Sequence, residues 1–181
     1  MPLEESAVAR ERLHTRQIKV EGYRREDGLW DIEASLLDEK DHDLGLVSSV
    51  RRAGEAVHCM RLRWTLDSSL TILAVDVAMD ALPYTGVCDT IKNRYEQLVG
   101  LRVGAGFKRA VGERFRGVNG CSHMTELVGA MAAGSVQTLA PYLNRDAETR
   151  PLQIGGCHAW AEDGALVKAH YPAWFDGATT R

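Results

Sequence analysis

Hydrophobic and polar residues alternate in four segments of the first 80 residues. Alternation with a period of two is typical of β-strands that bury one face. In the third segment it places Met60, Leu62, Trp64 and Leu66 on one face. Polar turns at residues 26–28 (EDG) and 67–69 (DSS) connect the segments in pairs, which predicts two hairpins. The predicted strands are residues 15–23, 29–37, 57–66 and 70–79.

The period of the pattern changes after residue 88. Apolar residues now recur every three or four positions, which predicts helices at residues 89–98, 107–115 and 122–143. The longest of them has a buried stripe of Met124, Leu127, Val128, Met131 and Leu139. Strands that come first and helices that follow predict an α+β fold, with an antiparallel sheet of hairpins followed by helices.

The remaining segments complete the predicted organisation. Residues 38–54 are polar and predict a long loop, and residues 165–170 predict a weak strand. A chain of 181 residues has the size of a single domain. We divide it into an N-terminal extension with a hairpin (1–53), a metal-site core (54–143) and a C-terminal extension (144–181).

Composition restricts the classes of partner. Lys and Arg total 22 and Asp and Glu total 25, so the net charge is -3 and the chain as a whole lacks the basic surface of a nucleic-acid-binding protein. No apolar run approaches the ~20 residues of a membrane-spanning helix. The charged N-terminus has no apolar segment typical of a secretory signal, so we expect a cytoplasmic protein.

Cysteine and histidine are the main candidates for chemistry. Four cysteines in a cytosolic chain without a CxxC pair do not indicate a disulfide framework. Cys88 and Cys121 are each predicted at the start of a helix, where the helix dipole stabilises a thiolate. Two other cysteines, Cys59 and Cys157, are each adjacent to a histidine.

Proteins build tetrahedral zinc sites from cysteines and histidines that come from separate elements. We therefore predict His58, Cys88, Cys121 and His123 as metal ligands. Glu126 follows His123 at i+3 on the same helix face, which makes Glu126 and His123 the candidate catalytic residues. In the alternative interpretation, the cysteines are small buried hydrophobes. His14 and His42 lie in polar segments and are predicted to be solvated.

Several segments resemble an uncharacterised bacterial family that is known only as a domain of unknown function. They are GYRREDGLWDIEASLLDEK, RAGEAVHCMRLRWTLD, DALPYTGVC and GVNGCSHMTEL. The family pattern has a His in AGExxH, a Cys after DAxPY and GCxH before a helix. This sequence matches it at His58, Cys88, Cys121 and His123. The resemblance covers residues 11–140 and implies no activity.

Residues 54–135 also resemble, more distantly, the iron–sulfur cluster scaffold fold of the IscU and NifU N-terminal type. That resemblance implies a strand pair followed by two helices that each begin with a ligand cysteine, here Cys88 and Cys121. His58 stands where the family has a ligand Asp, and Ala56 stands where it has a ligand Cys. The chaperone motif Leu-Pro-Pro-Val-Lys is replaced by FRGVNGC. Two cysteines and two histidines are typical of a zinc site or of Rieske-like iron.

Four functional hypotheses remain open at this point. The leading one is a metal-dependent enzyme, a lyase or a hydrolase, that binds zinc or iron and acts on a small organic substrate. The second is a carrier of zinc or of an iron–sulfur cluster. The third is a metal-free enzyme with Cys121 as nucleophile and His123 or His58 as base. The fourth is a structural zinc site. The C-terminal aromatic residues Tyr171, Trp174 and Phe175 are a candidate contact to a second copy in a homodimer.

Overall fold

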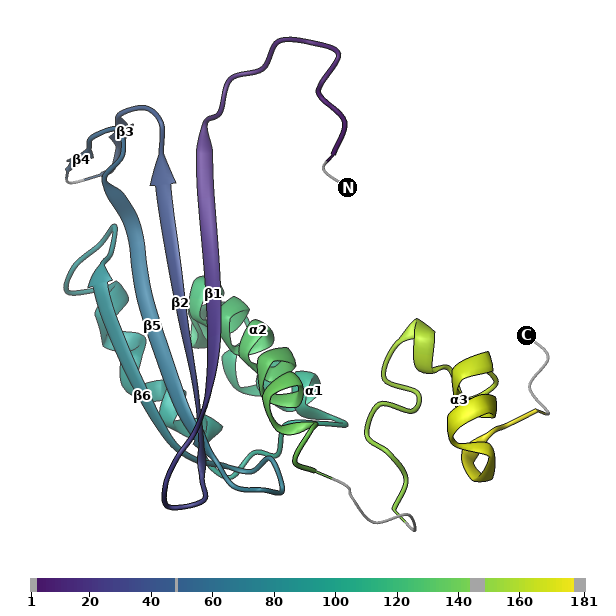
Figure 1. Ribbon diagram of the computed structural model, residues 1–181. Helices are drawn as coiled ribbons and strands as arrows, with labels where there is room; N and C mark the ends of the chain where they lie inside the picture. The colour runs from purple at the N-terminus through teal and green to yellow at the C-terminus, as the bar shows by residue number, and fades with distance from the viewer. Residues whose placement is uncertain (1–2, 48, 144–148, 178–181) are drawn as a thin grey trace. The chain divides into compact units, whose positions relative to one another are not determined.

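Four antiparallel strands form the main sheet, in the order β1-β2-β5-β6 (Figure 1). The computed structural model describes residues 3–47, 49–143 and 149–177. The chain divides into two compact units, Met1–Val136 and Gln137–Arg181, and the sheet belongs to the first. The strands are β1 (His14–Arg24), β2 (Trp30–Lys40), β5 (Ala56–Leu66) and β6 (Ile72–Ala81).

Both predicted hairpins are present, and they join into one sheet. β1 pairs with β2 across the turn at residues 25–29, and β5 pairs with β6. The hairpins meet where β2 pairs with β5, in a register that places Trp30 opposite Leu66 and Asp38 opposite His58. The N-terminal hairpin is therefore continuous with the strands that follow it.

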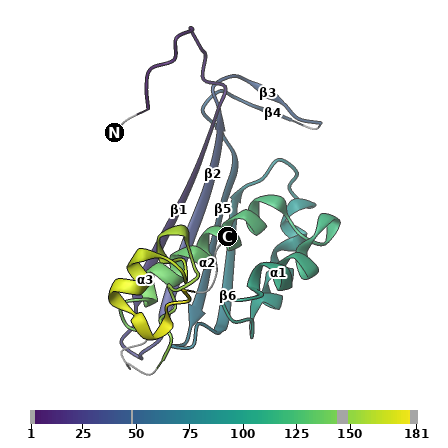
Figure 2. The same cartoon turned by 90° about the vertical axis from the view of Figure 1, so that its right-hand side faces the viewer.

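One face of the sheet carries the helices (Figures 1 and 2). Helical segments follow β6 in the order η1 (Cys88–Leu98), α1 (Phe107–Phe115), η2 (Gly117–Asn119) and α2 (Ser122–Leu139). The predicted helices at residues 107–115 and from residue 122 are confirmed. The predicted helix at residues 89–98 forms a 3-10 helix.

The core lies between the sheet and these helices. On β2, every second residue from Trp30 to Leu36 is buried, and the predicted inward face of β5 is buried as well. The helix α2 contributes Met124, Leu127, Val128 and Met131 of the predicted stripe, and all four are fully buried. Leu139, the last residue of the stripe, belongs to the second unit and is buried as well. At Gly134 a side chain would place its Cβ 2.5 Å from Val20 Cγ1, so glycine allows α2 to pack closely against β1.

A short hairpin replaces most of the long loop that the sequence predicted at residues 38–54. The strand β2 continues to Lys40, because β1 pairs with it along its whole length and His14 lies opposite Lys40. Two short strands, β3 (Leu44–Gly45) and β4 (Val50–Arg51), then pair with each other. The loop prediction was therefore wrong at its start, where Asp38 is part of the sheet.

The second unit is helical in its described part. It contains η3 (His158–Trp160), α3 (Ala165–His170) and η4 (Pro172–Trp174). The weak strand predicted at residues 165–170 is wrong. No strand pairs with this segment within the described ranges, and local hydrogen bonds such as Lys168 N–H to the Gly164 carbonyl form a helix instead. Residues 144–148 of the predicted C-terminal extension lie outside the described residues.

None of the helices in the described ranges combines the length and the apolar character that crossing a membrane requires.

Candidate functional site

The register of the sheet aligns three polar side chains on its helix-covered face. Arg16 of β1 lies opposite Asp38 of β2, and Asp38 lies opposite His58 of β5. Asp38 continues the inward series of Trp30, Ile32, Ala34 and Leu36, because side chains at alternate positions of a strand share a face. Its carboxylate is therefore held against the core, and only 3% of the residue is exposed.

Asp38 is the centre of the hydrogen-bond network. Arg16 donates to both of its oxygens, from Nε and Nη2, over 2.7 Å each. His14 Nε2 lies 3.1 Å from Oδ1, and His58 Nδ1 lies 3.0 Å from Oδ2. Burial by itself would raise the pKa of Asp38, but the hydrogen bonds from Arg16 and His14 outweigh it and lower the pKa to about 2. The carboxylate is thus ionised at neutral pH.

The first turn of α2 brings His123 to the same place. The rings of His58 and His123 are stacked, with their centroids 3.8 Å apart, and His123 Nε2 lies 3.6 Å from Asp38 Oδ2. Burial lowers the pKa of both histidines, and the charges of neighbouring groups modify this effect. Both imidazoles are therefore neutral at pH 7, the form that offers a lone pair to a cation.

These three side chains lie close enough to one another that they could hold a metal ion. One donor atom each from Asp38, His58 and His123 lies within 4.8 Å of the others. Among the described residues, this group includes neither Cys88 nor Cys121. Of the four ligands that the sequence predicted, the structure thus brings two histidines together and adds an aspartate that the prediction missed.

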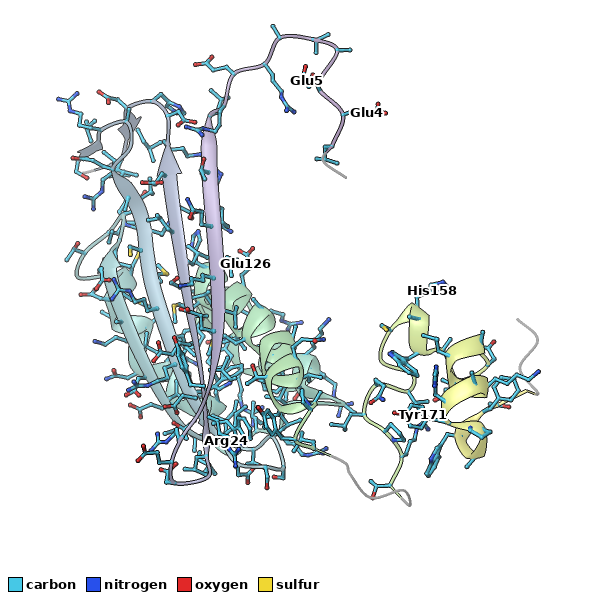
Figure 3. The ribbon with its side chains drawn as sticks, viewed as in Figure 1. Glu4, Glu5, Arg24, Glu126, His158 and Tyr171 are labelled. Carbon is cyan, nitrogen blue, oxygen red and sulfur yellow. The ribbon has the colours of Figure 1, made fainter. Side chains whose placement is uncertain are left out.

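Glu126 projects from α2 (Figure 3) and is connected to this group through Arg16. Its Oε2 accepts a hydrogen bond of 2.5 Å from Arg16 Nη1, so Arg16 connects the carboxylates of Glu126 and Asp38. The side chain of Glu126 is 46% exposed, whereas that of Asp38 is 4% exposed. A reactant would therefore approach from the side of Glu126 and Arg16.

The cysteines are arranged differently from the prediction. Cys121 Sγ lies 3.7 Å from His123 Nδ1, on the opposite side of that ring from Asp38. Cys88 is the first residue of η1, and the four cysteines are all free. Cys59 points to the outer face, where its thiol lies 3.8 Å from Asp80. Only Cys121 is thus in contact with the histidine group.

A buried tyrosine fixes the start of α2. Tyr95 of η1 stacks on Phe115 with parallel rings 4.6 Å apart. Its hydroxyl accepts a 3.0 Å hydrogen bond from the Cys121 N–H and also lies 3.0 Å from the Cys121 carbonyl and 3.1 Å from the Thr125 hydroxyl. Tyr95 therefore provides the Cys121 N–H at the helix start with a partner, while the Cys121 carbonyl also accepts a hydrogen bond from Thr125 N–H. These contacts set the position from which His123 projects.

We expect Tyr95→Phe to lower the free energy of unfolding by about 1 to 2 kcal/mol, because the Cys121 N–H loses its partner in a buried position. Urea unfolding measures the change. Tyr84→Phe is the matched control, because Tyr84 is 40% exposed, and its change stays within about 0.5 kcal/mol. Equal losses in the two variants would contradict the role assigned to the Tyr95 hydroxyl.

Three members of the network were not identified from the sequence. His14 is exposed, as predicted, but its ring also contacts Asp38, a contact that was not predicted. Arg16 and Asp38 were not considered as site residues. A signal for Asp38 existed in the alternation of the second strand, which continues two positions beyond Leu36. For Arg16 the sequence carries no comparable signal, since its role follows from pairing across the sheet.

Comparison with known protein families finds one that matches this chain. A family model described as "Protein of unknown function (DUF2889)" matches residues 14–137. The chain belongs to this family. The DUF2889 match begins at the first residue of β1 and reaches into the last turn of α2, so it includes every residue of the Asp38 network. No curated protein and no solved structure matches the chain.

Proposed function

We propose that this DUF2889 protein is a metal-dependent enzyme that acts on a small organic substrate, with the ion held by Asp38, His58 and His123. The observation that carries the proposal is the convergence of these three donor atoms within 4.8 Å, at the boundary between the core and solvent. Two imidazoles and one carboxylate are a common ligand set for catalytic zinc and for non-haem iron, and both leave positions open for water or substrate.

The protonation states support this assignment. A carboxylate with a pKa of about 2 and two imidazoles with lowered pKa values need lose no proton to the solvent before a cation binds. Arg16 and His14 already orient Asp38, in the way that surrounding hydrogen bonds orient metal ligands. The donor set is therefore organised before an ion arrives.

The other residues of the network have separate tasks. A bound ion would polarise a substrate carbonyl or lower the pKa of a bound water, which is the chemistry of metal-dependent lyases and hydrolases. Arg16 holds Oε2 of Glu126, while Oε1 accepts no hydrogen bond from the part of the chain that the structure describes. Glu126 Oε1 is thus left to take a proton from water or substrate, which supports Glu126 as the general base.

Other expectations from the sequence stay predictions. They are the iron–sulfur scaffold fold, the carrier function, the cytoplasmic location and the homodimer. An iron–sulfur cluster is held mostly by thiolates, and the group around Asp38 offers nitrogen and oxygen donors instead. This donor set supports a single zinc or iron ion over a cluster.

The proposal is tested on the full chain purified without chelators. Elemental analysis is expected to find about one zinc or iron per chain. The metal-free chain, prepared by dialysis, is then titrated with Zn²⁺ and, without oxygen, with Fe²⁺. A chain that retains no metal and binds neither ion at micromolar concentration would overturn the proposal.

The contact between Cys121 and His123 favours a second candidate, a metal-free thiol enzyme. His123 lies between Cys121 and Asp38, with its Nδ1 3.7 Å from the sulfur and its Nε2 3.6 Å from the carboxylate. This is the order of nucleophile, base and orienting carboxylate in thiol and serine hydrolases.

Alkylation distinguishes this candidate from the metal enzyme. At pH 7 in a metal-free sample, iodoacetamide would modify Cys121 faster than the exposed Cys157, and His123→Ala would remove the difference. His42→Ala is the control, because His42 is exposed and lies outside the network. Peptide mass spectrometry follows both rates, and a Cys121 that reacts no faster than Cys157 would rule out the thiol mechanism.

A further inference from the structure

A second polar row lies next to Asp38 on the same face of the sheet. His14 of β1 and Lys40 of β2 are directly opposite each other, two positions beyond Arg16 and Asp38. Residues two apart on a strand point to the same side, so Lys40 shares the face of Asp38. This row lies at the end of the sheet where β1, β2 and β5 extend past the helices (Figures 1 and 2).

Lys40 is a cation without an ion pair. The residue is half-buried, and none of the carboxylates in the described ranges lies within ion-pair distance of its ammonium group. Its backbone carbonyl accepts a hydrogen bond from Gly54 N–H, which holds the end of β2 in place. A half-buried charge gains stability from a partner of opposite sign, and the described residues supply none.

The charges around the site favour an anion. Asp38 and Glu126 balance the two cations Arg16 and Lys40. A divalent ion at Asp38 would therefore add an uncompensated positive charge to this cluster. Arg16 is already engaged by both carboxylates, which leaves Lys40 as the cation that is free to pair with a ligand.

We infer that the substrate is a small organic anion, and that its carboxylate or phosphate group pairs with Lys40 beside the metal position. The inference rests on the proposed function, because it names the substrate class of that same site. Lys40 acts as a specificity-determining residue: it binds the anionic end of the substrate while the reacting end lies at Asp38, His58 and His123. A charged hydrogen bond of this kind is strong enough to select anions over neutral molecules.

The experiment is calorimetric titration of the zinc-loaded full chain at low salt, with succinate in one arm and inorganic phosphate in the other. We expect binding of at least one of them, and the arm that binds distinguishes a carboxylate from a phosphate ligand. Lys40→Gln should weaken that binding by about tenfold or more, and Lys40→Arg should preserve most of it. The control is Lys19→Gln, which removes an equal charge from the exposed outer face. Circular dichroism and zinc content confirm that each variant folds and is loaded.

The outcomes separate this inference from the proposed function. If zinc binds but neither anion does, or if Lys40→Gln binds as well as the parent chain, the anion site is overturned and the metal site stands. If the chain binds no zinc, the same titrations are made without metal. Binding that still depends on Lys40 would then support the anion site and contradict the metal enzyme. Equal losses in the Lys40 and Lys19 variants would show only general charge attraction and would overturn the inference.

Discussion

Asp38→Asn is expected to lower the free energy of unfolding at pH 7 by about 2 to 3 kcal/mol. The carboxylate accepts both hydrogen bonds from Arg16 and contacts three histidines in a position that is almost fully buried. Asparagine keeps the size of the side chain but loses its charge and one of its acceptor oxygens. Arg16 keeps its hydrogen bond to Glu126 but loses the charge of its buried partner. The main cost is that the buried position of Asp38 no longer satisfies all the donors that point at it.

The pH dependence of this difference follows from the pKa of Asp38. The folded value of about 2 lies below the ordinary value of 3.8, so the unfolded chain binds the proton more tightly. The stabilisation is therefore complete above about pH 5 and is lost as the pH falls from about 4 through 2. At pH 3 the difference between parent chain and Asp38→Asn should be roughly half of its value at pH 7.

Urea unfolding at pH 7, 4 and 3 measures both effects. Asp76→Asn is the matched control, because Asp76 also pairs with an arginine, Arg63, but on the exposed outer face. Its effect should stay below about 1 kcal/mol. If both aspartate variants lose the same stability, or if the loss at Asp38 does not decrease toward pH 3, the ionised carboxylate does not have the structural role assigned to it.

His58→Ala and His123→Ala are each expected to weaken zinc binding by at least about 100-fold, since even residues that only support metal ligands contribute 10- to 100-fold. Removal of one imidazole leaves two of the three donors grouped in the structure. Calorimetric titration of the metal-free variants with Zn²⁺ measures the loss. His42→Ala is the control, because it removes an exposed histidine from the adjacent loop.

Cysteine variants distinguish the two possible sets of metal ligands, the Asp/His set from the structure and the Cys/His set from the sequence. Cys88→Ser should bind zinc as the parent chain does, because Cys88 lies outside the Asp38 group. Cys121→Ser should weaken zinc binding by no more than about 10- to 100-fold, which is the effect of a residue that only supports a metal ligand. The reason is that its sulfur contacts His123 on the side away from Asp38. A loss at Cys88→Ser as large as that at His58→Ala would contradict the Asp/His site. It would restore the set of His58, Cys88, Cys121 and His123 that the sequence predicted.

The local pattern of apolar residues was sufficient to predict a strand or helix wherever one side of that element is buried along its length. The alternation in the strands and the stripe on α2 predicted the buried residues correctly, because burial of apolar surface is the dominant stabilising effect and repeats with the period of the element. The same principle failed at residues 165–170. Six residues are too short a segment to distinguish the two periods, and the described part of the chain provides no strand to pair with them.

The candidate site could be predicted only in part, for a related reason. His58 and His123 could be proposed as ligands because each lies within two residues of a cysteine, near a predicted strand start or helix start. Asp38 stood at the start of a polar run, and polar runs are usually loops. Pairing with β1 along its full length, and with β5 as far as Glu39, extends β2 beyond Asp38 and turns that residue toward the core.

The sequence by itself determined the class of fold, the two hairpins, the start of α2 and two of the three proposed ligands, since each of these depends on neighbours within a few positions. The tertiary structure decided which side chains meet. Arg16, Asp38, His58 and His123 come from four different elements, and sheet register and the anchoring of α2 by Tyr95 place them together. Contacts between distant segments depend on how whole elements pack, and the spacing of residues along the chain does not encode that packing directly.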